Sequence, residues 1–308
     1  MSKSKLVKLA AFAVAILAGG GVYAYLASTK MPTADEMLGK YLEQTAKMTS
    51  FASTESYSAT GATVASTGYI DTAAKKYVMQ ADVSCDTTIE SKPVALKATM
   101  QLENDKTYLK LTSISGTVAL DEETTLDLAN AFGTIAGKWY DVGVANTEVA
   151  AQVEAGVYVS ESGIIAPSQD AAKIAKSLQD NKTFVAGSIA KDGKNFTLTF
   201  MADKQHYLES LKSLFPSLKS PDLILDQIFD TQSFQVTLTV DKAGNLISEK
   251  LTQPSVCNDL FTTFVGVEGT NVAKDLTGTS TLKAAGSVSI PSVTAARPLE
   301  DMSDALVY

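Results

Sequence analysis

The chain has 308 residues, of which 45% are hydrophobic and 19% are charged, and its formal net charge is −8. This length allows one large or two small domains with enough apolar side chains for a core. Acidic residues exceed basic ones, and the only arginine is Arg297. Because such a surface repels nucleic acid and offers few guanidinium forks for phosphate, we expect no nucleic-acid partner.

The first 30 residues differ in composition from the rest. They hold four lysines and no acidic residue, and no charge occurs from residue 9 to residue 29. Lysines before an apolar run are typical of an export signal, and about 20 apolar residues suffice to cross a bilayer. Two alternatives therefore stand for residues 1–30, an N-terminal transmembrane anchor and a cleaved signal. We favour the anchor because the apolar run is longer than the usual signal core.

The lysines also predict an orientation. They place the N-terminus in the cytoplasm and the following domain outside the cell membrane, with membrane contact through residues 9–29. A cleaved signal would instead release the domain by secretion. Residues 31–308 by themselves hold 22 basic and 34 acidic side chains, a net charge of −12.

A helix is expected directly after this segment. Thr33 and Glu36 have the spacing of a capping box, in which each side chain binds the backbone N–H of the other residue. Apolar residues then recur at helical spacing. This pattern predicts an amphipathic helix that ends near Met48.

Beyond this helix the apolar period changes to two, which is typical of half-buried strands. The clearest case is residues 94–103, where Met100 and Leu102 belong to the apolar set and mostly polar residues alternate with it. In the first half of the chain, this pattern predicts strands at residues 69–70, 77–85, 94–103, 107–111 and 137–142.

The second half of the chain mixes helices and strands. Residues 168–178 are a helix candidate with Ser168 as the N-cap, and residues 147–155 are weakly helical. Asp192-Gly193 predicts the turn of a β-hairpin. Further helices are expected at residues 203–215, 221–229 and 258–265, and strands at residues 184–190, 196–201, 234–240, 246–252 and 279–290.

These elements predict an α+β fold, an N-terminal membrane segment followed by one antiparallel sheet with helices packed on one face. Because the strands alternate strictly, one face of the sheet should be wet and the other covered. We assign residues 31–290 to a single β-rich domain and residues 291–308 to a C-terminal tail that is ordered only in part.

The sequence nominates no catalytic machinery. His206 is the only histidine, so any Ser-His-Asp or Cys-His mechanism would need it, and neither cysteine has a nucleophile signature around it. One histidine and two remote cysteines do not make a zinc site, and no glycine-rich phosphate motif occurs. We therefore expect that the protein is not an enzyme and that it binds no metal and no cofactor. A hydrolase is the alternative, and it would need two or more polar groups that converge in a cleft.

Cys85 and Cys257 leave two alternatives open. In an oxidising compartment they could form a disulfide that closes a very long loop. They could equally be two separate buried thiols, because the sequence does not give the distance between them.

The order of the elements resembles the lipoprotein-carrier superfamily, the LolA/LolB and LppX-like fold, over residues 32–291. After the N-terminal helix, residues 66–71 and 75–78 are similar to the family's first hairpin, and residues 138–142 resemble its K-W-Y-x-[VI] strand. Residues 234–252 are similar to the penultimate hairpin. Residues 287–291 resemble the closing strand, which ends at a proline.

The resemblance implies an antiparallel half-barrel sheet that helices cover on its concave face, with an apolar cavity between the two. Family members carry lipoprotein acyl chains or other lipids. This chain departs from them because it has no lipidation cysteine before Cys85. It also has no evident equivalent of the arginine with which LolA holds its lid, since Arg297 lies in the tail. We therefore do not expect it to shuttle lipoproteins.

Two functional hypotheses follow. The first is a membrane-anchored, non-catalytic extracytoplasmic domain that binds a lipid or other hydrophobic ligand by burial of apolar area. The second is a cell-envelope structural or interaction domain with a filled core and no ligand. A continuous apolar void favours the first hypothesis and tight packing the second. The expected lining is Met100, Leu102, Phe196, Leu198, Phe200, Phe234, Val236 and Leu238 on the sheet, with Leu208, Leu211 and Phe215 on the helical cover.

Overall fold

The structure is a computed structural model that describes residues 31–104, 106–119, 124–144, 152–228, 231–266, 272, 274–284 and 288–301. The predicted membrane segment at residues 9–29 and most of the weak helical signal at residues 147–155 lie outside the described residues. None of the helices that are described is both long and apolar enough to cross a membrane.

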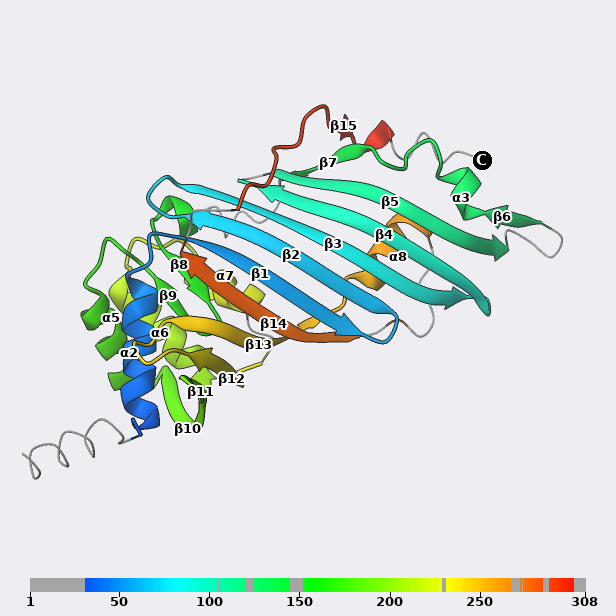
Figure 1. Cartoon of the computed structure of the whole chain (residues 1–308). Coiled ribbons are helices and arrows are strands. Elements are labelled where there is room, and N and C mark those ends of the chain that lie inside the picture. The colour runs from blue at the N-terminus through cyan, green and yellow to red at the C-terminus, as the bar shows by residue number, and fades with distance from the viewer. Residues whose placement is uncertain are drawn as a thin grey trace, which may run out of the picture.

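One large, open and mostly antiparallel sheet forms the body of this α+β protein (Figure 1). The strand order is β10-β11-β12-β13-β14-β1-β2-β3-β4-β5-β7-β15, and the short β6 pairs with β5 beside this path. The strands of the first half are β1 (Ser50–Ala59), β2 (Ala62–Asp71), β3 (Lys76–Ile89), β4 (Lys92–Glu103), β5 (Lys106–Ala119), β6 (Thr125–Asp127) and β7 (Trp139–Val144). Those of the second half are β10 (Phe184–Asp192), β11 (Asn195–Asp203), β12 (Ser233–Val240), β13 (Leu246–Pro254), β14 (Asp275–Ala284) and β15 (Arg297–Pro298).

Helices cover one face of this sheet in two groups. Helices α2 (Ala34–Ala46), α5 (Ala171–Asp180), α6 (Lys204–Leu214) and α7 (Pro221–Ile228) lie near strands β10–β13, and α3 (Leu128–Ala131) and α8 (Cys257–Val265) lie near β3–β5 (Figure 1). A separate two-stranded hairpin, β8 (Tyr158–Ser160) and β9 (Gly163–Ile165), contacts α2. We call the sheet face turned toward these elements the inner face.

One row of paired residues runs along the inner face from β11 to β3. Leu198 pairs with Leu238, which pairs with Glu249. From Glu249 the row continues through β14, β1 and β2 to Ala81 of β3. Because directly paired residues point to the same side of a sheet, both helix groups cover the same face.

Three hydrophobic clusters fill the inner face. The largest joins α2, α5, α6 and α7 to strands β10–β13. The second lies under α3 and α8 against strands β1–β5. A small third cluster has Phe51, Ile70 and Ile165 among its members. The core is therefore divided into three clusters.

The first helix forms as its sequence predicts. In α2, the hydroxyl of Thr33 accepts from the backbone N–H of Glu36, and the Glu36 carboxylate accepts from that of Thr33, which confirms the capping box. The predicted stripe packs into the largest cluster, where the Tyr41 ring lies 6.5 Å from that of Phe200.

Most of the strands and helices predicted for the second half of the chain are also confirmed. One predicted N-cap, Ser168, is wrong. The N-cap of α5 is Asp170, whose carboxylate accepts from the N–H groups of Ala172 and Lys173, and Ser168 lies two residues before it. A carboxylate at this position also suits the positive end of the helix dipole.

Several elements escape the sequence pattern. Strand β1 was not predicted because two of its inner positions are Ser53 and Glu55, which break the apolar alternation. Strands β8 and β9 are only three residues long, too short for a period to appear. The last long strand, β14, starts at Asp275 instead of residue 279, and residues 288–290 are not in a strand.

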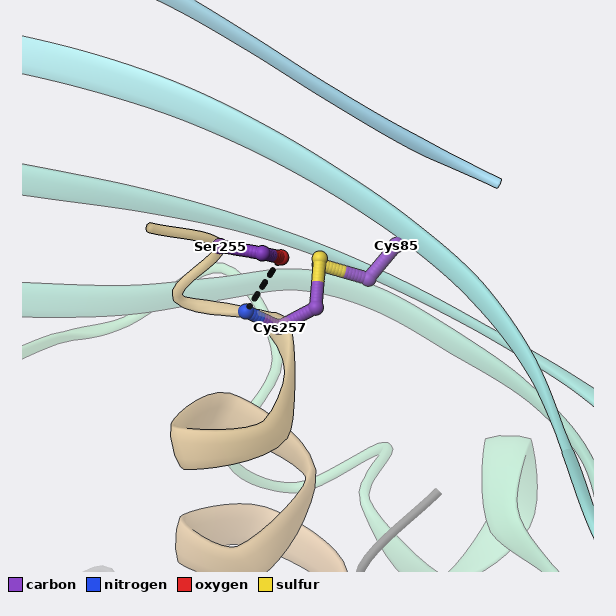
Figure 2. The surroundings of a disulfide bond; sticks show 3 residues. All are labelled: Cys85, Ser255 and Cys257. Carbon is purple, nitrogen blue, oxygen red and sulfur yellow. Dashed lines mark hydrogen bonds between the residues drawn. A yellow bond between two sulfur atoms is a disulfide. The ribbon is translucent and has the colours of Figure 1, made fainter. Parts of the chain in front are cut away.

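Cys85 and Cys257 form a disulfide, the first of the two alternatives that the sequence left open. It joins the inner face of β3 to the first residue of α8, and both cysteines are fully buried. Figure 2 shows the bond, with the hydroxyl of Ser255 accepting from the backbone N–H of Cys257. The bond therefore fixes α8 against the sheet.

The described part of the C-terminal tail packs on the sheet. The side-chain amide of Gln101 donates to the carbonyl of Pro291 at 2.9 Å, and the hydroxyl of Ser292 donates to the Glu103 carboxylate at 2.7 Å. Strand β15 then pairs in parallel with β7 at the end of the sheet. This segment covers the β7 edge of the sheet.

Candidate ligand-binding pocket

A polar strip crosses the middle of the inner face. Glu249 of β13 pairs with Ser280 of β14, Ser280 pairs with Glu55 of β1, and Glu55 pairs with Ser66 of β2. Four adjacent strands thus place two carboxylates and two hydroxyls in one row. Since neighbouring strands lie about 4.8 Å apart, the two glutamates are about 10 Å apart along this row.

The β8–β9 hairpin covers this strip. The hydroxyl of Tyr207, a fully buried residue of α6, donates to the carbonyls of Ser160 at 3.0 Å and Gly163 at 2.9 Å. The side-chain oxygen of Gln152 accepts from the N–H of Val159 at 2.9 Å. These bonds from outside the hairpin hold its backbone in place over the strands.

A pocket of about 190 Å³ lies between the hairpin and the inner face. Aromatic and aliphatic side chains make part of its wall, and Phe51 and Tyr158 stand with ring centroids 5.4 Å apart. Hydroxyls and three carboxylates make the rest. The lining residues are Thr45, Phe51, Ser53, Glu55, Ile70, Met79, Tyr158, Val159, Ser160, Glu161, Ile165, Glu249, Leu251 and Ser280.

A chain of buried hydrogen bonds leads from α2 to this pocket. The Tyr41 hydroxyl donates to the hydroxyl of Ser162 at 2.8 Å, and the Ser162 hydroxyl donates to Oε2 of Glu249 at 3.1 Å. All three residues are at least nine-tenths buried. Ser162, at the hairpin tip, therefore connects α2 to β13 through one carboxylate oxygen.

The other oxygen of this carboxyl is left without a partner. Glu249 is 6% exposed, and its Oε1 has no hydrogen-bond partner among the described residues. Burial raises the pKa of Glu249 to about 8; the bond from Ser162 opposes this rise, and the nearby Glu161 and Glu55 reinforce it. At neutral pH the group is therefore mostly a neutral carboxylic acid.

Glu55 has more partners than Glu249. Its Oε2 accepts from the hydroxyl of Tyr57 at 3.1 Å and from that of Ser66 at 2.9 Å. Burial, and then the negative charge of Glu55, raises the pKa of Tyr57 and of Tyr158. The tyrosines around the pocket are thus hydrogen-bond donors at physiological pH.

The side chains that the sequence nominated as ligand-lining lie elsewhere in the core. Nine belong to the largest cluster or pack against it, Met100 packs against the second cluster, and Leu102 packs against the third. None of the eleven lines the 190 Å³ pocket. Their role in ligand binding stays a prediction. The nine are Phe196, Leu198, Phe200, Leu208, Leu211, Phe215, Phe234, Val236 and Leu238.

Sequence reasoning missed the polar lining altogether. One signal was available: Glu249 occupies an inner position two residues before Leu251, where the strand pattern calls for an apolar side chain. Glu55 likewise falls between Ser53 and Tyr57 on β1. A carboxylate on the buried face of a strand is rare enough to nominate a site by itself.

The only histidine lies on α6, outside the pocket lining. The Nδ1 atom of His206 is 3.6 Å from Oδ1 of Asp203, and the His206 side chain is 45% exposed. Within the described ranges, histidine, cysteine, aspartate and glutamate side chains form no group of three that could hold a metal ion.

A comparison with protein-family models and with curated proteins found nothing that matches this chain.

Proposed function

We propose that this chain is a non-catalytic extracytoplasmic domain that binds a small amphiphilic ligand in the pocket beneath the β8–β9 hairpin. The observation that carries the proposal is Glu249, which lines the pocket and whose buried Oε1 has no hydrogen-bond partner among the described residues. A buried polar atom without a partner costs free energy, and a ligand that binds it recovers that cost. The geometry fits a small-molecule site, in which a few polar groups orient a mainly apolar guest.

The volume of the pocket limits the size of the ligand. A cavity of about 150 Å³ holds benzene, and drug-sized ligands occupy about 300–1,000 Å³. At about 190 Å³, this pocket suits a guest of roughly ten heavy atoms. A lipid with two long chains would need the helices to separate from the sheet.

Two further parts of the proposal concern fold and location. We infer that the curved sheet and its helices are a half-barrel of the lipoprotein-carrier type, covered on the concave face. Support comes from the single large, mostly antiparallel sheet with helices on one face.

We also infer that residues 1–30 anchor the domain to a membrane with the domain outside. The lysines of this segment and its uncharged run support this inference.

A cell-envelope interaction domain without a ligand is the second candidate. It is favoured by the dense packing of the predicted lining, where Leu198, Phe200 and Leu211 are fully buried in the largest cluster. In that case the pocket is a packing defect.

Native mass spectrometry separates these candidates. The full chain, isolated gently in lipid nanodiscs from a lipid-containing host, should retain one stoichiometric small molecule that disappears on solvent extraction. Extraction of the same sample identifies the molecule. A clean apo mass, with no uptake of added fatty acid or small amphiphile, would contradict the ligand-binding proposal and leave the interaction domain.

A further inference from the structure

The ionisable acidic and basic side chains that line the pocket beneath the hairpin are all acidic. Three of its lining residues are carboxylates, Glu55, Glu161 and Glu249, and the described lining includes no lysine or arginine. The carboxylates come from three different elements, β1, the β8–β9 turn and β13. Interaction among them is strong enough that Glu161 and Glu55 contribute to the raised pKa of Glu249.

A second observation concerns the hydrogen bonds of Glu249. Glu249 is more than nine-tenths buried, Ser162 donates to its Oε2, and within the part of the chain that the structure describes its Oε1 has no partner. A donor that carries positive charge would satisfy Oε1 and also offset the repulsion that Glu55 and Glu161 exert on an ionised Glu249. A neutral donor would satisfy Oε1 without any electrostatic benefit.

The rest of the wall suits an organic cation better than a bare metal ion. The described histidine, cysteine and acidic residues do not converge into a metal-ligating group. The pocket also presents Phe51 and Tyr158, whose ring faces attract cations, together with aliphatic side chains such as Ile70 and Leu251. Aliphatic and aromatic area of this kind binds the carbon skeleton of a guest.

We propose that the pocket is specific for a small organic ammonium ion, a protonated alkyl- or arylalkylamine of about ten heavy atoms or fewer, with the Glu249 carboxyl as its anchor. This inference rests on the proposed ligand-binding function and adds the chemistry of the ligand's head group. Glu55 and Glu161 supply attraction over a longer range, and Phe51, Ile70 and Tyr158 bind the apolar body.

Binding of the cation is coupled to loss of a proton. Below its pKa of about 8, Glu249 is mostly protonated in the free protein, and the ammonium ion favours its ionised form, so the proton passes to the buffer. Besides the Ser162 hydroxyl, the titratable groups that interact with Glu249 are Glu55 and Tyr57 on β1, Glu161 and Tyr158 on the hairpin, Tyr41 on α2 and Tyr207 on α6. The tyrosines stay neutral in this range because burial raises each of their pKa values. Affinity should therefore rise from pH 6 to pH 8.

The test compares three probes of one size, benzylamine, benzyl alcohol and benzoate, by isothermal titration calorimetry of the full chain in nanodiscs. We expect benzylamine to bind at least about tenfold more tightly than benzyl alcohol, and benzoate not to bind. Titration in two buffers of different ionisation enthalpy should show release of close to one proton per benzylamine bound at pH 7.

Glu249→Gln should abolish the preference for benzylamine and the proton release while leaving benzyl alcohol unaffected. Glu209→Gln, on the exposed face of α6, is the matched control and should change neither. If Glu249→Gln does not fold, the half-exposed Glu161→Gln replaces it, with an expected loss of about threefold or more in benzylamine affinity.

The outcomes separate this inference from the proposed function. If benzyl alcohol binds as tightly as benzylamine, or if the glutamine variant keeps the amine preference, the ammonium inference is wrong and an apolar binding site remains. If none of the probes binds and the isolated chain also has a clean apo mass, both fail.

Discussion

Glu249 makes the stability of this protein depend on pH. Its folded-state pKa of about 8 lies above its ordinary value of 4.5, so the folded state binds this proton more tightly than the unfolded state does. The tighter proton binding by Glu249 stabilises the folded state. This stabilisation is fully present below about pH 4.5 and is lost as the pH rises through about 8. Its size is on the order of a few kcal/mol.

Glu249→Gln should therefore raise stability at pH 9 and have little effect at pH 5, because glutamine keeps the shape without the charge. Urea unfolding midpoints at pH 5, 7 and 9 measure this. Glu209→Gln, on the protein surface, should follow the wild-type curve. Parallel pH profiles for wild type and Glu249→Gln would show that this carboxyl does not carry the effect.

Ser162 is the second residue whose loss should be costly. Its hydroxyl accepts from Tyr41 and donates to Glu249, so Ser162→Ala leaves two buried groups without that partner. Each such group costs about 1–3 kcal/mol, which chemical denaturation would register as a lower free energy of unfolding.

The matched control for Ser162 is Ser168→Ala. Ser168 is exposed, and Asp170 caps α5 in its place, so this substitution should be close to neutral. Equal losses in the two variants would argue against the buried hydrogen-bond chain.

Among the elements, the β8–β9 hairpin depends on a helix for its position. Tyr207→Phe removes the hydroxyl that binds the carbonyls of Ser160 and Gly163. Amide hydrogen exchange in residues 158–165 should become faster, because local opening of the hairpin costs less free energy. Tyr69→Phe, which removes a hydroxyl bonded to Asp71 at the surface, should leave exchange in the hairpin unchanged.

Helix α8 depends on a covalent bond as well as on packing. The disulfide joins residues 172 positions apart, so it restricts a very long loop in the unfolded chain. Cys85→Ala with Cys257→Ala should cost about 2–5 kcal/mol of unfolding free energy. Addition of reductant should lower the unfolding midpoint of wild type and leave the double variant unchanged; a midpoint for wild type that does not respond would contradict this role.

At the scale of the whole molecule, the location of the domain decides whether this disulfide forms. The full chain, if residues 1–30 export it, should sediment with membranes and show no free thiols on alkylation. The same chain without residues 1–30 should stay in the cytosol, where thiols are kept reduced. Two labelled thiols in the full chain would contradict export.

Much of the architecture was predictable because it rests on local periodicity. The capping box at Thr33 and the alternation in β4 and β12 depend only on residues within one element, so they identified each element correctly. The elements that escaped prediction have weak local signals. Strand β1 carries Ser53 and Glu55 on its inner face, and β8 and β9 are too short to show a period.

The sequence by itself determined the class of the protein, an acidic, β-rich chain with amphipathic helices, because composition and periodicity are properties of nearby residues. Only the tertiary structure decided where the pocket lies. Glu55, Glu161 and Glu249 lie 106 and 88 positions apart along the chain, and strand order and the hairpin cover bring them together. Strand pairing over such separations depends on the whole sheet, and no local pattern contains it.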